Sequence, residues 1–173
     1  RSIRKGCFFI CENDECTRNY QQYRKFLARI ARNPEHQKFK AKNWKTVQDK
    51  QFISLMNDSK WIQLQYAVQC LDFPPAYVIK LLTEEQDKVF EKNFMDHIPS
   101  YWGNWSAVYE EGMPCFFNIE YMIVHPRYSK YQGMLIDPLI VDEYDAFRQI
   151  LMDLNLTFDE VNCCFIVHAY MSV

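Results

Sequence analysis

Glycine is scarce in this chain: only Gly6, Gly103, Gly112 and Gly133 occur among its 173 residues. A loop that cradles phosphate groups needs closely spaced glycines, so this scarcity argues against a P-loop or a dinucleotide-binding fingerprint. The nucleophile elbow of hydrolases and the paired histidines of zinc-protease helices are missing as well. The sequence therefore predicts neither a cofactor nor a metal site of a familiar kind.

Long apolar runs are also missing. No run approaches the roughly 20 residues that a membrane-spanning helix requires, so no membrane partner is predicted. Internal repeats and low-complexity tracts are absent, which argues against a solenoid. Apolar residues still make up 49% of the chain, an ordinary share for a globular protein. The length is typical of one compact domain.

The cysteines do not form a disulfide framework. There are seven, an odd number, which favours a reducing compartment and a cytoplasmic location. We interpret them as small buried apolar residues. The alternative is a zinc site built from Cys7, Cys11, Cys16 and His36, but this spacing lacks the tight Cys-x2-Cys pair of most structural zinc sites.

The C-terminal third shows the clearest local order. Residues 115–125 alternate apolar and polar side chains as a half-buried strand does, and Pro126 ends the run. Asp142 is a suitable cap for a helix to about Asn155, with apolar residues at helical spacing. Residues 161–170 are more uniformly apolar and predict a second, buried strand. Strand, helix and strand together predict an α/β layer over residues 113–173.

Residues 15–97 predict four or five short helices. One of them would begin at Pro74-Pro75 and run to Leu82, and the stretch 65–82 resembles a helix-turn-helix, although Leu71 stands where its turn requires glycine. The predicted fold class is therefore α+β: a mainly helical N-terminal half, residues 1–98, packed on a small mixed α/β layer, residues 113–173. The two parts would form one compact domain.

Charge is distributed unevenly along the chain. Residues 1–50 carry 13 Lys and Arg against 5 Asp and Glu, whereas the remainder carries 7 against 17. Basic residues mixed with aromatic ones are typical of nucleic-acid binding, because lysine and arginine neutralise phosphates and aromatic rings stack on bases. This segment gives an alternative function, nucleic-acid binding, through Arg18, Lys25, Arg29, Arg32, Lys38, Lys40, Lys42 and Trp44.

An aromatic and acidic segment supports the function that we favour, non-catalytic binding of a protein partner. Tryptophan and tyrosine carry much of the energy of protein interfaces, and nearby acid suits a partner with a basic surface. Immunity proteins and phage-encoded inhibitors often have this size and lack of motif. The alternative is that these aromatics fill the junction between the two halves. The predicted binding residues are Tyr101, Trp102, Trp105, Tyr109, Glu110 and Glu111, with further acid at Asp137, Asp142, Glu143 and Asp145.

Two histidines give a third hypothesis, a hydrolase or phosphoesterase. His125 and His168 end similar apolar runs, and as strand neighbours they would serve as acid and base at one site. Two-histidine phosphoesterases carry Thr or Ser two positions after each histidine, whereas Arg127 and Tyr170 stand there in this chain. The sequence therefore favours a protein that is not an enzyme.

Overall fold

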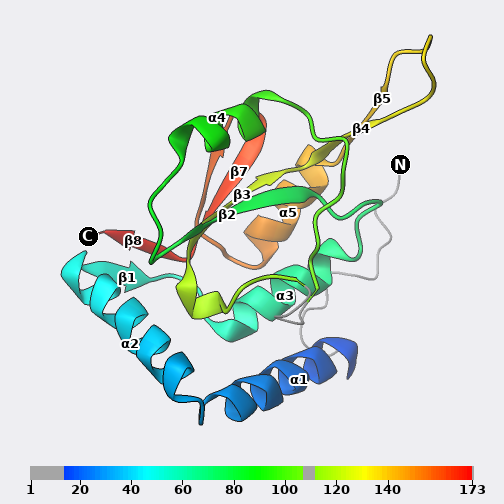
Figure 1. Ribbon diagram of the computed structural model, residues 1–173. Helices are drawn as coiled ribbons and strands as arrows, with labels where there is room; N and C mark the ends of the chain where they lie inside the picture. Colours follow the sequence, from blue (N-terminus) through cyan, green and yellow to red (C-terminus); the bar gives the residue numbers. More distant parts are fainter. Residues whose placement is uncertain (1–13, 107–111, 173) are drawn as a thin grey trace.

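A four-stranded antiparallel sheet lies at the centre of the protein (Figure 1). The computed structural model describes residues 14–106 and 112–172. Both faces of the sheet are covered, so its two central strands are apolar on both sides. The strands lie in the order β2 (Ala76–Leu81), β3 (Ile119–His125), β7 (Cys164–His168) and β6 (Phe158–Val161).

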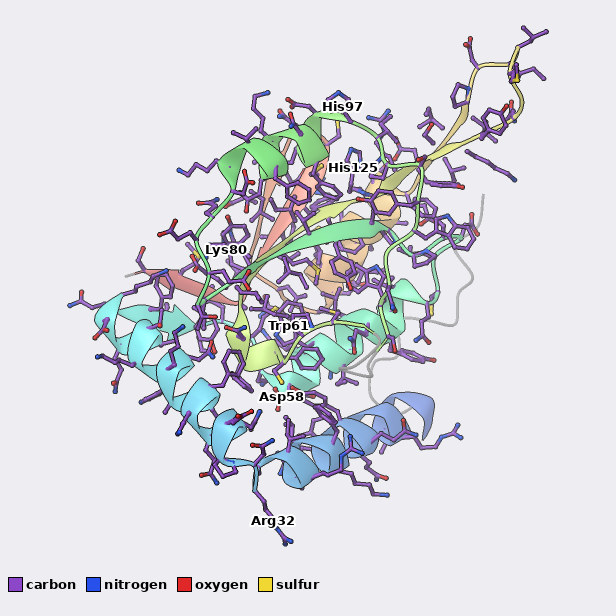
Figure 2. The ribbon with its side chains drawn as sticks, in the orientation of Figure 1. Arg32, Asp58, Trp61, Lys80, His97 and His125 are labelled. Atoms are coloured by element: carbon purple, nitrogen blue, oxygen red, sulfur yellow. The ribbon has the colours of Figure 1, made fainter. Side chains whose placement is uncertain are left out.

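The main core lies between one face of the sheet and two helices. Helix α3 (Asp58–Val68) begins at Asn57, whose side chain accepts a hydrogen bond from the Lys60 amide. Helix α5 (Tyr144–Asp153) covers the same face. Figure 2 shows Trp61 of α3 inside this core, where its ring stacks on Phe116. The core also contains Met122, Val124, Phe147, Leu151, Phe165 and Val167.

A smaller apolar cluster covers the opposite face. Helix α4 (Lys88–Asp96) begins at Asp87, whose carboxylate accepts a hydrogen bond from the Phe90 amide. Its Phe94 packs with Ile123 of β3 and Cys164 of β7. The protein therefore has three layers, with α4 on one side of the sheet and α3 and α5 on the other.

The remaining elements lie at the edges of this body. Helix α1 (Asp14–Ile30) buries Tyr23 against Phe116, while α2 (Pro34–Asp49) begins at an Asn33 cap. A two-stranded sheet joins β1 (Phe52–Ser54) to β8 (Tyr170–Ser172). A short 3-10 helix, η1 (Phe116–Asn118), precedes β3. A hairpin of β4 (Arg127–Lys130) and β5 (Leu139–Asp142) projects from the end of the body opposite α1 and α2 (Figure 1). None of the described helices is long and apolar enough to cross a lipid bilayer.

The α+β class and the helix before Asn155 are confirmed. The strand predicted over residues 115–125 is confirmed only from Ile119, because residues 116–118 form η1, and it is buried on both faces where a half-buried strand was predicted.

The helix predicted after Pro74-Pro75 is wrong, because residues 76–81 form β2 and pair with β3. The helix-turn-helix that residues 65–82 resemble is therefore wrong as well. The sheet is not confined to residues 113–173, since β2 belongs to it, and every ladder among the described strands is antiparallel.

The buried strand predicted over residues 161–170 is confirmed only at its centre, where β7 spans Cys164–His168. Asn162 and Cys163 both have positive φ angles, of 49° and 61°, and form the two-residue turn between β6 and β7. Such turns need positive φ at both central positions, and asparagine adopts it more readily than most residues. Beyond His168 the chain leaves β7 and pairs with β1 instead.

Candidate functional site

The projecting hairpin, residues 127–142, exposes an unusual amount of apolar surface, and we call it the apolar arm. Its strands pair in register from Arg127 with Asp142 to Lys130 with Leu139. Beyond this ladder, Met134 and Leu135 are 93% and 99% exposed, so the apolar tip contacts almost nothing else in the described structure. The exposed apolar residues of the arm are Tyr131, Met134, Leu135, Ile136, Leu139 and Ile140.

The base of the arm is held firmly to the body. Tyr128 packs against Phe73, with ring centroids 5.6 Å apart, and against Trp102, at 5.9 Å. The Ser129 amide donates a hydrogen bond to the Pro99 carbonyl over 2.8 Å. These contacts fix the direction of the arm and bring residues 99–102 beside it. The exposed tip is therefore presented by an anchored hairpin.

Two of the predicted protein-binding residues lie next to this base. Tyr101 and Trp102 are both more than half exposed, and Trp102 touches the arm through Tyr128. Trp105 is different: it is 5% exposed, and its indole Nε1 donates a hydrogen bond to the Pro75 carbonyl over 2.7 Å. Its prediction as an exposed anchor is wrong, because it fills the core beside β2. The other three predicted residues, Tyr109, Glu110 and Glu111, lie outside the described residues.

Gly103 sets how this segment meets the body. A Cβ atom at this position would lie 2.2 Å from the Pro75 carbonyl oxygen, closer than any side chain tolerates. The Gly103 amide donates a hydrogen bond to the Pro74 carbonyl over 3.1 Å. The close approach turns Trp105 inward and leaves Tyr101 and Trp102 outside.

Buried titratable groups flank the start and end of the arm. His125 is 2% exposed, and burial together with the Arg127 charge lowers its pKa to about 4, against a weaker opposing effect of Asp142. Glu143 is 8% exposed, and burial raises its pKa to about 7, although its Oε1 accepts a hydrogen bond from the Asp72 amide over 2.5 Å. Arg127 forms an ion pair with Asp142 at 3.2 Å. At neutral pH His125 is uncharged and Glu143 is near its midpoint.

The two histidines of the enzyme hypothesis lie far apart. Strands β3 and β7 are neighbours, but they are antiparallel, and His168 pairs with Tyr121 at the other end of β3 from His125. Tyr121 and His125 are four positions apart along β3, which is roughly 13 Å at the rise of a strand. His168 forms an ion pair with Asp159 at 2.8 Å, whereas His125 is buried against Phe94, with ring centroids 6.0 Å apart. This geometry gives no support to a shared acid–base site.

The eight residues predicted to bind nucleic acid are all exposed and lie on α1, α2 and the turn between them. Figure 2 shows Arg32 pointing into solvent from that turn. Tyr23, by contrast, belongs to the core. The basic face and the apolar arm therefore lie at opposite ends of the protein (Figure 1).

The cysteines divide into two kinds. Cys115, Cys163 and Cys164 carry free thiols, and Cys115 and Cys164 are buried as expected. The interpretation as small buried apolar residues is wrong for Cys163, which is exposed, and Cys70 is disulfide-bonded rather than a free thiol. No group of metal-ligating side chains occurs among the residues that the structure describes. Cys7 and Cys11 of the zinc hypothesis lie outside them, as does the side chain of Cys16.

Sequence reasoning missed the arm. Its signal is local: Met134-Leu135-Ile136 are three consecutive apolar residues between Gly133 and Pro138, where a loop is normally polar. An apolar triplet bracketed by glycine and proline, outside any helix or strand pattern, indicates an exposed apolar loop.

Comparison with known proteins places the chain in a family. A family model described as a family of unknown function (DUF6678) matches residues 43–173, well over half of the chain. The chain therefore belongs to this family. No curated protein and no solved structure matches it. The apolar arm and residues 99–105 lie within the matched span, whereas α1 and the beginning of α2 lie before it.

Proposed function

We propose that this member of the DUF6678 family is a non-catalytic protein-binding module that holds its partner with the apolar arm and with Tyr101 and Trp102. The observation that carries the proposal is the exposure of Met134 and Leu135 on an anchored hairpin. Monomeric proteins rarely expose contiguous apolar surface on this scale unless it binds something. We propose further that binding occludes a functional surface of the partner, as inhibitors and immunity proteins do.

The arm suits insertion into a concave partner. Its tip presents three apolar side chains in a row, and Tyr131 and Leu139 flank them. Apolar anchors that enter a pocket contribute most of an interface's energy, and the anchored base lowers the entropy lost on binding. Asp137 at the tip and Asp145 at the start of α5 are exposed acids, which supports a pocket with a basic rim.

A matched set of variants tests the arm. Wild-type protein and a Met134→Ser/Leu135→Ser variant would be used to capture partners from an extract of the source cells, and the recovered partner would be purified and titrated. We expect saturable one-to-one binding that the double substitution weakens at least tenfold. Met152→Ser is the control, because Met152 is also an exposed methionine but lies on α5, away from the arm. Equal affinity for all three proteins, or capture of no protein at all, would contradict the proposal.

Nucleic-acid binding is a second candidate, supported by the exposure of all eight predicted residues on α1 and α2. It predicts binding to single-stranded oligonucleotides whose affinity falls steeply with salt. Charge reversal at Arg29 and Arg32 should abolish that binding and leave partner capture by the arm unchanged. Oligonucleotide binding that changes neither with salt nor with these substitutions would exclude nucleic-acid binding by the basic face.

We place both activities in the cytoplasm. The free thiols of Cys115, Cys163 and Cys164 support a reducing compartment. The disulfide at Cys70 instead supports an oxidising compartment. Thiol counting by mass spectrometry on protein purified without reductant decides between them: a free Cys70 thiol in freshly prepared protein supports the cytoplasm, and a quantitative disulfide contradicts it.

A further inference from the structure

A cavity of about 380 Å³ lies between α2, η1 and β8, at the opposite end of the protein from the arm. Its volume is within the usual range for sites that hold small organic ligands. Four of its lining residues follow one face of α2 at positions i, i+3, i+4 and i+7. The cavity is lined by Gln37, Lys40, Ala41, Asn43, Trp44, Phe117 and Tyr170.

Three aromatic rings from three separate elements give this cavity flat walls. Trp44 of α2 is 64% exposed and takes part in none of the ring contacts among the described residues. Phe117 of η1 is held between His36, at 5.7 Å, and Phe39, at 5.8 Å. The Tyr170 hydroxyl donates a hydrogen bond to the Phe117 carbonyl over 3.1 Å, which ties β8 to η1. Two walls are therefore fixed, and the indole at the mouth has a free face for stacking.

The charge around the cavity favours an anionic ligand. The Lys40 ammonium lies 5.8 Å from the centroid of the Phe117 ring, at the aromatic wall itself. Lys38, Lys42 and Lys45 are exposed on the same helix, against Glu35 and Asp49. Beyond α2, the Asp58 carboxyl at the start of α3 interacts electrostatically with Lys40, although Arg24 acts on it more strongly. Glu120 forms ion pairs with Lys50 at 3.3 Å and Lys80 at 3.4 Å. The lysines of α2 outnumber its acids, and this positive excess favours an anionic group whose attached ring system stacks on Trp44.

Asn43 forms the inner wall of the cavity. It is 2% exposed, the most buried of the lining residues, and its Nδ2 donates to the Phe39 carbonyl over 2.9 Å. Its Oδ1 is closed to solvent and accepts no hydrogen bond from any described residue, so Asn43 shapes the wall without offering the ligand an acceptor. The exposed indole and the cation together match a ligand with an aromatic ring and a negative charge.

We propose that this cavity binds a nucleobase together with its attached phosphate. The base stacks on Trp44 and Phe117, and the phosphate meets Lys40. The ligand is either a free mononucleotide or one nucleotide of a single strand, and the chemistry of recognition is the same for both. The inference deepens the nucleic-acid candidate by giving it a base-binding site, and it is independent of the apolar arm.

The test is a calorimetric titration of the full chain with the four nucleoside monophosphates and with a short single-stranded oligonucleotide. Saturable binding of a monophosphate identifies a free nucleotide as the ligand, and binding of the oligonucleotide alone identifies a single strand. Trp44→Ala should weaken either interaction about tenfold or more, since base stacking is lost. Trp102→Ala, which removes an equally exposed indole at the other end of the protein, should leave it unchanged.

Lys40→Gln distinguishes the contribution of the phosphate to binding from that of the base. It should weaken the nucleotide severalfold and leave the corresponding nucleoside unaffected, whereas Lys45→Gln, on the same helix but away from the cavity, should change neither. No binding of any probe, or equal affinity in Trp44→Ala and Trp102→Ala, overturns the inference. If the oligonucleotide still binds Trp44→Ala at wild-type affinity but not an Arg29→Glu/Arg32→Glu variant, the basic face binds nucleic acid and the cavity does not.

Discussion

Replacing Glu143 by glutamine should change how the free energy of unfolding depends on pH. Burial raises the pKa of Glu143 from 4.5 to about 7, so the folded protein holds this proton more tightly than the unfolded chain. The contribution of Glu143 to the free energy of unfolding is therefore fully present below about pH 4.5 and is lost as the pH rises to about 7. At about 1.4 kcal/mol for each pKa unit, the loss is about 3 kcal/mol.

His125 contributes the opposite dependence. Burial lowers its pKa from 6.5 to about 4, so its contribution is fully present above about pH 6.5 and is lost as the pH falls towards 4. The loss is again about 3 kcal/mol. Between about pH 4.5 and 6.5 the two slopes have opposite signs and similar size. The wild-type free energy of unfolding should therefore be nearly flat across this range.

Glu143→Gln removes the pH dependence of stability that Glu143 contributes, so the dependence that His125 contributes becomes measurable. The variant keeps a carbonyl oxygen for the Asp72 amide but cannot ionise. Urea unfolding followed by circular dichroism should show its stability rising by about 2 kcal/mol between about pH 4.5 and 6.5, and exceeding the wild type by about 3 kcal/mol near pH 8. Glu85→Gln, at an exposed position, serves as the control. Parallel curves for wild type and Glu143→Gln would refute the reasoning.

Three further substitutions test the fold, two of them in the segment beside the arm and one in the turn between β6 and β7. Trp105→Ala should cost about 3–5 kcal/mol in urea unfolding, because it empties a buried site and removes the hydrogen bond to Pro75; an unchanged midpoint would show that Trp105 is not core. Gly103→Ala should cost about 1–3 kcal/mol, since its Cβ would meet the Pro75 carbonyl, and a neutral effect would contradict that close approach. Cys163→Gly should raise thermal stability by up to about 1 kcal/mol, because glycine adopts the positive φ of this turn without strain; a clear loss would argue against the turn.

The parts of the fold that were predicted correctly are those with a strong local pattern. Helix α5 has an apolar stripe at helical spacing and an asparagine that follows it with a positive φ of 49°, although its N-cap position is Glu143 and Asp142 only accepts a hydrogen bond from the Tyr144 amide. Strand β2 is not predicted because Pro74-Pro75 suits a helix start, although Tyr77-Val78-Ile79 is rich in β-formers. Its pairing with β3, some 40 residues away, decides its structure, and no local pattern contains that information.

The candidate sites show the same division between local and long-range information. The basic residues of α1 and α2 are predicted from the local excess of lysine and arginine in residues 1–50, because charged side chains are rarely buried. Trp102 and Trp105 lie three residues apart, yet one is exposed and one is buried. That difference depends on the close approach of Gly103 to Pro75, which the sequence does not reveal. The walls of the cavity likewise combine residues 44, 117 and 170, which only the fold brings together.

The central claim, that the apolar arm binds a protein partner, is tested most directly by removing its tip. Lys130 and Leu139 are directly opposite in the ladder, so residues 131–138 can be replaced by Asn-Gly, the preferred two-residue hairpin turn. This deletion removes Tyr131, Met134, Leu135 and Ile136 and leaves the anchored base intact. We predict an unchanged free energy of unfolding and loss of partner binding in titration. Wild-type affinity in the shortened protein would contradict the account.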